Sequence, residues 1–474
     1  MDKRYRELEE LLAPCGQEHL LRFWTELDDE QKARLEGQIR SFDWEKISSW
    51  IETYALQKPD HDLPAELEPA SYFPVHPHTD EEKALYSRAD TRAIELLRAG
   101  KVAGFTVAGG QGTRLGFDGP KGTYPVAPIT GKSLFQLFAE MILRAQRKYN
   151  CVIPWYIMTS AINDKPTRQF FEENDYFGLD SENVSFLVQG TLPAISYDGK
   201  VLLAAKDSLA LSPDGHGGSL SALRKSGAVA DMRRRGIELI SYWQVDNPLV
   251  QPFDRKFLGL HSVKNADVSC RSLTKTGPYE KLGNFCLSDG KLMIVEYSDM
   301  PDELARAQDS AGRLRFRAGS PAIHMFDLAF VERLTEGGNS RLPLHRADKK
   351  VPHLDDTGNE VKPSEPNAVK LEMFIFDALP LADEVLILEA DRSEQFAPVK
   401  NASGVDSAES CRKLMQERCA RWIEKAGVAV PRDQDGNLDC KIEMSPAVYL
   451  DQEDVQARAD NIRAPKRGNE EYYE

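Results

Sequence analysis

An apolar run that ends in a cluster of glycines is the feature that most constrains the fold of this chain. The run covers residues 102–108 and leads directly into Gly109-Gly110-Gln111-Gly112-Thr113-Arg114-Leu115-Gly116, followed by Pro120-Lys121. Closely spaced glycines after a strand let the backbone approach a ligand and direct successive N–H groups into one concavity, which suits phosphate oxygens. Arg114 and Lys121 add positive charge. The stretch therefore predicts a phosphate-binding turn after a buried strand.

Two better-known glycine-rich motifs do not fit this chain. A dinucleotide-binding Gly-x-Gly-x-x-Gly loop that starts at Gly110 requires glycine at position 115, where the chain has Leu115. The triplet Gly131-Lys132-Ser133 resembles the end of a P-loop, but Val126 occupies the position of the first P-loop glycine. A tight turn with exposed cations is the structural alternative. It accounts for one or two of these residues rather than for the whole cluster.

Alternating strand and helix patterns predict an α/β fold. Helical spacing predicts helices over 81–99 and 134–145, and apolar runs predict the strands. These strands are 102–108, 152–158, 184–187, 237–245, 268–273, 292–297, 321–326 and 385–389. The order predicts a doubly wound, Rossmann-like mixed sheet, largely parallel and layered with helices.

The pattern changes toward both ends of the chain. Helical spacing at Leu8–Leu12, Leu20–Leu27 and Leu35–Phe42 predicts a short helical unit, and the Pro-, Asp- and His-rich stretch 58–79 reads as a linker. We therefore expect three consecutive parts. They are a helical N-terminal unit with its linker at 1–98, a central α/β domain at 99–382 and a small C-terminal domain at 383–474.

The charge balance argues against several classes of partner. The 474 residues include 60 Lys and Arg but 75 Asp and Glu, which gives a net charge of −15. Nucleic acids and anionic membranes require a broad cationic surface, so we expect neither as a partner. No apolar run approaches the roughly 20 residues that cross a bilayer. An anionic small molecule is compatible with this charge, because a few Lys and Arg can reverse the field inside one cleft.

The cysteines and the first residues indicate a reduced, cytoplasmic protein. Seven cysteines are scattered without a Cys-x-x-Cys pair, so neither a disulfide framework nor a thiolate zinc site is expected. The chain starts MDKRYRELEELL, which lacks the apolar core of a secretory signal. We expect a cytoplasmic location. The oligomeric state does not follow from these features.

The glycine-rich stretch also carries a family resemblance. Residues 109–121 resemble the signature G-G-x-G-T-R-L-G-x-x-x-P-K of the UDP-sugar pyrophosphorylases, and are most similar to the eukaryotic type of UDP-N-acetylglucosamine pyrophosphorylase. Further matches follow in order along nearly the whole chain, at 16–24, 189–194, 213–218, 245–247, 295–298, 369–377 and 398–401. The resemblance implies a nucleotide-sugar transferase fold and the reaction of UTP with a sugar 1-phosphate, aided by Mg²⁺, to give a UDP-sugar and pyrophosphate.

The same resemblance assigns roles to individual residues. Arg114 and Lys121 would be catalytic, and Asp246 would hold the metal ion. The residues implied to bind UTP are Ala108, Gly109, Gly110, Lys121, Gln189, Gly215 and Lys370. Those implied to bind the sugar phosphate are His216, Glu296, Ser320 and Lys400. No protein nucleophile is required, because the sugar phosphate oxygen attacks the α-phosphorus in line and the enzyme neutralises two polyanions.

Each assignment has a plainer alternative when its residue is considered alone. Lys370 and Lys400 are of a type that is nearly always solvated, and only the family match selects them. Asp246 follows an apolar strand, where α/β folds place ligands, but it also fits a turn with the next two residues. Glu296 fits a solvated strand face, and Gln189 and Gly215 fit ordinary turns.

Two departures from the family pattern concern the sugar. The eukaryotic acetylglucosamine enzymes have Asn where this chain has His216 and Ser320, and the Gly-His-Gly turn of UDP-glucose pyrophosphorylases resembles His216-Gly217. An imidazole and a hydroxyl differ from an amide in reach and in donor count. The resemblance as a whole implies N-acetylglucosamine 1-phosphate as the substrate, and these two departures keep glucose 1-phosphate and galactose 1-phosphate as alternatives. A noncatalytic nucleotide-sugar sensor is the alternative of another class.

Overall fold

The computed structural model of the chain describes residues 2–57, 63, 64, 66–338 and 340–474. They form two compact units. The smaller unit comprises the described parts of Met1–Ala65, with Gly190–Ser219 and Leu342–Ile375, and the larger comprises the described parts of Glu66–Gln189, Leu220–Arg341 and Phe376–Glu474. Each unit joins segments that are distant in sequence. The three-part division at 98/99 and 382/383 stays a prediction, and residues 58–62 and 65 of the predicted linker lie outside the described residues.

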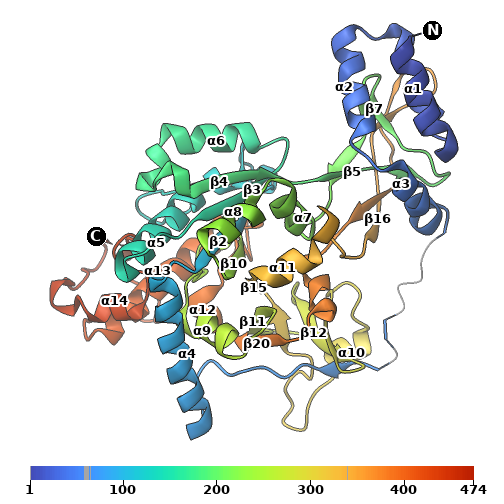
Figure 1. The fold of residues 1–474 in the computed structure, drawn as a ribbon. Helices are drawn as coiled ribbons and strands as arrows, with labels where there is room; N and C mark the ends of the chain where they lie inside the picture. Colours follow the sequence, from blue (N-terminus) through green and yellow to red (C-terminus); the bar gives the residue numbers. More distant parts are fainter. Residues whose placement is uncertain (1, 58–62, 65, 339) are drawn as a thin grey trace. The chain divides into compact units, whose positions relative to one another are not determined.

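A mixed sheet forms the centre of the larger unit (Figure 1). Its middle strands run in the order β4-β3-β2-β10-β15-β11. Their bounds are β2 Val102–Val107, β3 Trp155–Thr159, β4 Val184–Val188, β10 Leu239–Gln244, β11 Val268–Thr274 and β15 His324–Asp327. β4, β3, β2 and β10 are parallel, whereas β15 is antiparallel to both β10 and β11. The predicted mixed α/β class is therefore confirmed.

An outer group of strands extends the sheet beyond β11. It comprises β1 (Glu68–Pro69), β12 (Gly283–Ser288), β13 (Lys291–Val295), β14 (Ala318–Ser320) and β20 (Val385–Glu389). β14 pairs with both β11 and β12, and β12 also pairs with β13 and β1. β20 lies parallel to β11, as a buried strand of an α/β sheet should. β1 and β14 were not among the predicted strands because they are short, and β12 was not among them because polar residues stand on both sides of its short apolar run.

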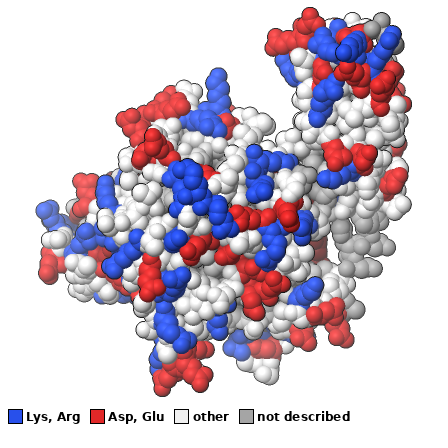
Figure 2. Space-filling view, viewed as in Figure 1, with Lys and Arg blue, Asp and Glu red and all other residues white. Residues whose placement is uncertain are grey.

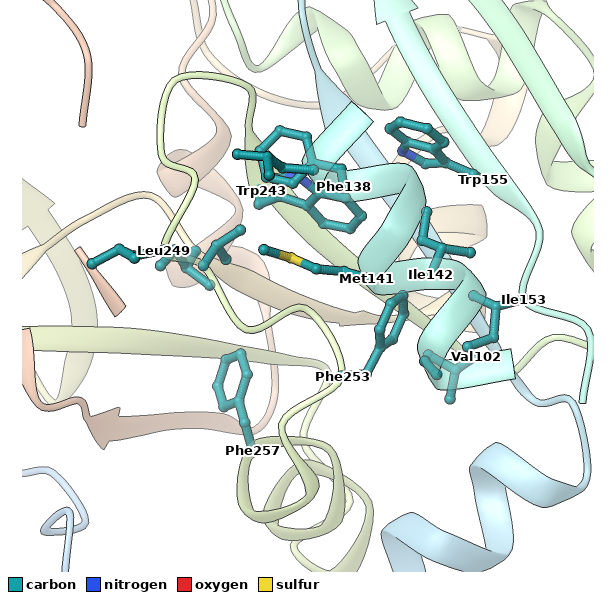
Figure 3. Close-up of a cluster of buried hydrophobic side chains, with 14 of the residues drawn as sticks. Val102, Phe138, Met141, Ile142, Ile153, Trp155, Trp243, Leu249, Phe253 and Phe257 are labelled. Carbon is teal, nitrogen blue, oxygen red and sulfur yellow. The ribbon is translucent and has the colours of Figure 1, made fainter. Parts of the chain in front are cut away.

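The longer helices of the larger unit pack on its core through apolar side chains. The helices of this unit are α4 Asp80–Arg98, α5 Leu134–Tyr149, α6 Asp164–Glu173, α8 Ala228–Arg235, α9 Arg255–Val263, α10 Asp302–Arg306, α11 Leu328–Leu334, α12 Arg392–Gln395, α13 Ala408–Lys425 and α14 Gln452–Gln456. α7 (Gly218–Lys225) begins in the segment of the smaller unit and ends in the larger. Figure 3 shows Phe138, Met141 and Ile142 of α5 among the side chains of the core. The Phe138 ring contacts the Trp243 ring edge to face at 5.7 Å between centroids.

Polar contacts of a buried carboxylate join the C-terminal part of the larger unit to the loop that precedes α5. β21 (Lys441–Met444) and β22 (Glu470–Tyr473) pair in parallel. The carboxylate of Glu443, which is 3% exposed, accepts hydrogen bonds from the backbone N–H groups of Ile129 and Thr130 at 2.7 and 2.9 Å. These bonds connect the C-terminal strands to the loop that precedes α5.

The smaller unit joins N-terminal helices to short strands. Its α-helices are α1 Lys3–Leu12, α2 Asp29–Arg40 and α3 Trp44–Trp50, and its strands are β5 Thr191–Pro193, β6 Ile195–Ser196, β7 Leu203–Ala205, β8 Ser208–Leu209, β9 Leu211–Pro213, β16 His345–Lys349, β17 His353–Leu354, β18 Glu360–Val361 and β19 Ala368–Glu372. In the segment Leu20–Leu27, where the spacing is helical, two short 3₁₀ helices form rather than one α-helix. Gln17, which is 2% exposed, bonds the backbone of Gly199 and Val201 at 2.9 Å each, and this anchor precedes the turns.

The surface carries mixed charge on the face shown in Figure 2, where basic and acidic side chains are interspersed. Within the part of the chain that the structure describes, no helix has the length and apolar character needed to cross a membrane. All seven cysteines are free thiols.

Candidate active site

The order of the strands places two predicted site segments at one edge of the sheet. β2 lies between β3 and β10, and the chain continues from β2 outward to β3 and β4 but returns on the other side to form β10. Open α/β sheets bind ligands outside the carboxyl ends of their strands, at the point where the strand order reverses. The glycine-rich loop follows β2, and Asp246 follows β10. The two segments are therefore neighbours at this point.

The side chain of Asn163, which is fully buried, holds the glycine-rich loop through hydrogen bonds. Its Nδ2 donates to the carbonyl oxygens of Ala108 and Gly110 at 2.9 and 3.1 Å, and its Oδ1 accepts from the N–H of Ser160 at 2.7 Å. Asn163 is the N-cap residue of α6, yet its side chain makes no capping bond to that helix and is fully buried. It instead fixes the direction in which the loop carbonyls point.

The backbone N–H groups at the start of the glycine-rich loop are not used in hydrogen bonds within the described part of the chain. The N–H groups of Gly109, Gly110 and Gln111 donate no hydrogen bond to any residue that the structure describes. A Cβ atom at Gly110 would meet no protein atom within 4 Å, and Gly110 does not have a positive φ. Neither packing nor backbone conformation therefore requires glycine at this position. A glycine here leaves the space beside the loop open, and unpaired N–H groups suit an anion.

Lys121 and Asp246 meet beside this loop. The N–H of Lys121 donates to the carbonyl of Gly110 at 3.1 Å, which anchors the residue to the loop. Its Nζ lies 3.7 Å from Oδ2 of Asp246, and the two side chains are 17% and 12% exposed. The neighbouring Asn247 makes the turn contact, with Oδ1 accepting from Leu249 N–H at 3.3 Å. The carboxylate of Asp246 is thus left to face Lys121.

Lys400 reaches the same place from a distant part of the chain. Asn247 bonds the backbone of Gln395 and Ala397 at 2.8 and 3.0 Å, and the carbonyl of Asp246 accepts from Val399 N–H at 2.8 Å. The segment that ends in Lys400 therefore packs along the residues that follow β10. This arrangement brings the backbone of Lys400 next to the Lys121–Asp246 pair.

A further carboxylate, that of Asp406, belongs to this cluster. The carbonyl of Asp406 accepts hydrogen bonds from the N–H groups of Lys400 and Asn401 at 2.6 and 3.0 Å. Burial raises the pKa of its carboxyl group, with a further rise from Asp246 and an opposing effect from Lys400. Two carboxylates and two ammonium groups thus interact at the carboxyl ends of β2 and β10.

Gln189, Glu296 and Ser320 also lie in the larger unit. A Cβ on Gly109 would come within 2.9 Å of Gln189 Oε1, so the Gln189 amide lies directly against the glycine-rich loop. Glu296 follows β13, and a Cβ on Gly283 would come within 3.2 Å of its Oε1. Ser320 pairs with Gly283 in the β12–β14 ladder. Glu296 and Ser320 are therefore neighbours around Gly283.

Gly215, His216 and Lys370 lie in the smaller unit. Gly215 has a φ of +82°, and a Cβ there would approach the carbonyl of Met373, so only glycine fits. His216 accepts a hydrogen bond at Nδ1 from Ile375 N–H at 3.1 Å and stacks on Phe374 at 5.4 Å between ring centroids. Burial lowers the pKa of His216 to about 4, so its ring is neutral near pH 7. Lys370 lies in the middle of β19.

Arg114 differs from the other predicted cations because it is exposed. It lies in a short 3₁₀ turn after Gly112, and it forms no ion pair with any residue that the structure describes. An unpaired guanidinium beside unpaired N–H groups is free to bind phosphate. A cavity of about 290 Å³ elsewhere in the larger unit, lined by Arg271 and Gln395 among others, contains none of the predicted site residues.

Comparison with known proteins settles the family. The family model described as UTP--glucose-1-phosphate uridylyltransferase matches residues 66–466. The chain belongs to this family. UDP-N-acetylhexosamine pyrophosphorylase-like protein 1 of Homo sapiens is 38% identical over 429 residues, which cover 88% of this chain and 85% of the relative. UDP-N-acetylglucosamine diphosphorylase 2 of Arabidopsis thaliana is 37% identical, over 89% of this chain and 86% of its own length.

The solved structures agree with the sequence relatives. The crystal structure of the uridine diphosphate N-acetylglucosamine pyrophosphorylase of Trypanosoma brucei, in complex with an inhibitor, matches 97% of this chain and 96% of its own with a TM-score of 0.80 and 25% identity. The family resemblance stated from the sequence is confirmed. The chain is an enzyme of the nucleotidyltransferase class, while the roles of its individual residues stay predictions.

Sequence reasoning missed Asn163 and Asp406. A single Asn after a strand carries no motif, and its three bonds join segments that are up to 55 residues apart. Asp406 lies only six residues after Lys400, but its carbonyl contacts follow from a loop closure that no periodicity reveals. The only hint in the sequence was that Asp406 is an acidic residue close after Lys400, which was predicted to bind the sugar phosphate.

Proposed function

We propose that this chain transfers the uridylyl group of UTP to a sugar 1-phosphate, which yields a UDP-sugar and pyrophosphate. An oxygen of the sugar phosphate forms a bond to the α-phosphorus of UTP. The bond from that phosphorus to the oxygen bridging it to the β-phosphate breaks, and the electron pair leaves on pyrophosphate. The observation that carries the proposal is the glycine-rich loop with free N–H groups after β2, beside Lys121 and the backbone of Lys400.

The residues of this edge contribute positioning and charge. In the proposed complex, the N–H groups of 109–111 donate hydrogen bonds to the phosphate oxygens of UTP, with Ala108 and Gln189 close to the same loop. Lys121 lies beyond hydrogen-bond distance of Asp246, at 3.7 Å, so its ammonium can turn to phosphate without losing a hydrogen bond. Arg114 binds the departing pyrophosphate, and Lys400 binds the sugar phosphate. Such preorganised cations are worth most where charge develops in the transition state.

Mg²⁺ fits Asp246 as a partner of bound phosphates. Among the described residues, no group of three or more His, Cys, Asp or Glu side chains could hold a metal ion alone. Mg²⁺ keeps several waters and commonly binds through one or two carboxylates plus substrate phosphates, which matches the Asp246 carboxylate beside the loop. The ion would neutralise phosphate charge. Asp246 and Asp406 supply the negative field that draws it to this edge.

N-acetylglucosamine 1-phosphate is the proposed sugar substrate, with glucose 1-phosphate and galactose 1-phosphate as alternatives. The names of the human and plant relatives support an N-acetylated hexosamine. Glu296 and Ser320, which lie together around Gly283, provide a carboxylate and a hydroxyl for sugar hydroxyls. Gly215, His216 and Lys370 keep the roles that the resemblance gives them. We also propose a cytoplasmic location, which the seven free thiols support.

The test is a turnover assay on the purified full chain. UTP and Mg²⁺ are mixed with each of the three sugar 1-phosphates, and pyrophosphate and UDP-sugar are measured together. We expect stoichiometric formation of both products, fastest with N-acetylglucosamine 1-phosphate. Binding of UTP or a UDP-sugar without pyrophosphate release from any of the three would instead establish a sensor.

A further inference from the structure

One buried lysine in the larger unit makes its hydrogen bonds to neutral oxygens rather than to a carboxylate. Lys275, which follows β11, is 7% exposed. Its Nζ donates to Asn284 Oδ1 at 2.7 Å and to the carbonyl of Pro278 at 3.2 Å, and no ion pair joins it to any carboxylate that the structure describes. Burial lowers its pKa, and the carboxylate of Glu280 has a smaller opposing effect. A buried cation whose hydrogen bonds all go to neutral oxygens is costly to the fold, which calls for a reason beyond stability.

The partner of Lys275 leads directly to the predicted sugar-binding residue. Asn284 is 1% exposed and lies in β12 opposite Val295 of β13. Its Nδ2 donates to the carbonyl oxygen of Val295 at 3.1 Å. Val295 is the last residue of β13, and Glu296 is the next residue in the chain. Lys275 thus orients the Asn284 amide, and the amide fixes the peptide group from which Glu296 projects.

The same lysine also packs behind the other sugar residue. A Cβ on Gly319 would lie 3.1 Å from Cγ of Lys275, so the stem of the lysine lies against the strand that ends in Ser320. Gly319 in turn pairs with Asn284 in the β12–β14 ladder. The Lys275–Asn284 pair therefore contacts the ends of three strands, β11, β13 and β14.

We propose that Lys275 and Asn284 are positioning residues for the sugar half of the reaction, which hold the Glu296 backbone and the Ser320 strand in the geometry that binds the sugar 1-phosphate. This inference rests on the proposed function. The buried charge of Lys275 is retained because an amide oriented by a cation holds the Val295 peptide more firmly than a free amide does. UTP binding at the β2–β10 edge does not depend on this pair.

The experiment separates the two substrates in steady-state kinetics. Lys275→Met keeps the length and volume of the stem and removes the ammonium group, and Asn284→Leu removes the amide. We expect each to raise KM for N-acetylglucosamine 1-phosphate at least tenfold and to leave KM for UTP within about twofold. Lys281→Met, an exposed lysine of the same connection, is the matched control and should match the wild type.

A double-mutant cycle distinguishes positioning from general support of the fold. Because both side chains act through one peptide group, Lys275→Met combined with Asn284→Leu should be no worse than either alone. The Tm of Lys275→Met should change little, because removal of a buried charge is offset by the loss of the donor to Asn284 Oδ1. An unchanged KM for the sugar phosphate, or equal rises in both KM values with a lowered Tm, would overturn the proposal. Failure of both single variants to fold would also overturn it, by making the pair structural.

The outcome is distinguishable from failure of the proposed function. Wild-type enzyme that releases no pyrophosphate with any sugar 1-phosphate refutes the function itself. Wild-type turnover together with an unaltered sugar KM in Lys275→Met refutes only the positioning role.

Discussion

Replacement of Asn163 tests whether the glycine-rich loop is held open by one side chain. Asn163→Ala removes three hydrogen bonds and leaves the buried Ala108 carbonyl and Ser160 N–H without partners. The Gly110 carbonyl keeps its bond from Lys121 N–H. At about 1–3 kcal/mol for each orphaned buried group, the variant should lose about 2–6 kcal/mol of unfolding free energy.

Asn163→Ala should also weaken UTP binding. Without the Asn163 amide, the carbonyls of Ala108 and Gly110 lose the donor that fixes their orientation, and the N–H groups of residues 109–111 no longer point in one direction. We expect KM for UTP to rise roughly tenfold or more, since a geometric error of about 1 Å costs on the order of 10² in rate. Asn163→Asp should be at least as defective, because it replaces the Nδ2 donor with an oxygen that faces two carbonyls. Urea unfolding and pyrophosphate release measure the two effects separately.

Asn174→Ala is the matched control at the opposite end of α6. Its Nδ2 bond to Phe170 O is exposed, so stability should change by less than about 1 kcal/mol and KM for UTP should stay the same. An Asn163→Ala enzyme that is destabilised but binds UTP as the wild type does would show that the loop keeps its geometry without this side chain. No loss of stability would refute the hydrogen-bond account itself.

Three further changes test the site and the core. Gly110→Ala should leave the unfolding free energy within about 0.5 kcal/mol of the wild type, because no protein atom approaches its Cβ, but it should raise KM for UTP at least tenfold. Gly277→Ala is the control, because its Cβ would also meet no protein atom. Equal kinetics in the two variants would place the phosphates elsewhere. Lys121→Met should lower kcat/KM by about 10²–10³ in the pyrophosphate assay, and a change below fivefold would remove Lys121 from the site. Burial lowers the pKa of His261 to about 3, so the unfolded state takes up a proton first and stability should fall by about 1.4 kcal/mol per pH unit from pH 6.5 toward pH 3. His261→Asn should flatten that slope in acid unfolding, and an unchanged slope would contradict the assignment.

The central sheet was predictable because its signals are local. The run before Gly109 and the strand before Asp246 are continuous and apolar, and glycine and aspartate follow them directly. The structure places both at the reversal point of strand order, as the fold class requires. Site features that depend only on the residues next to a strand end could therefore be predicted from the sequence.

Features that depend on distant contacts were not predictable. The smaller unit combines segments far apart in the chain, and β6 pairs with β19, whose first residue comes 172 positions after the last of β6. The Leu20–Leu27 spacing suits an α-helix, but the segment follows an anchor to Gly199 and Val201 and forms 3₁₀ turns instead. Asn163 and Lys275 are single residues without a motif, and only their three-dimensional partners reveal their roles.

A crystal structure of the full chain with Mg²⁺ and a UTP analogue that cannot be cleaved at the α-phosphorus tests the account most directly. It should show phosphate oxygens on the N–H groups of residues 109–111, with the Lys121 ammonium turned from Asp246 toward them. Phosphates bound at any other edge of the sheet, with Lys121 still directed at Asp246, would contradict the account.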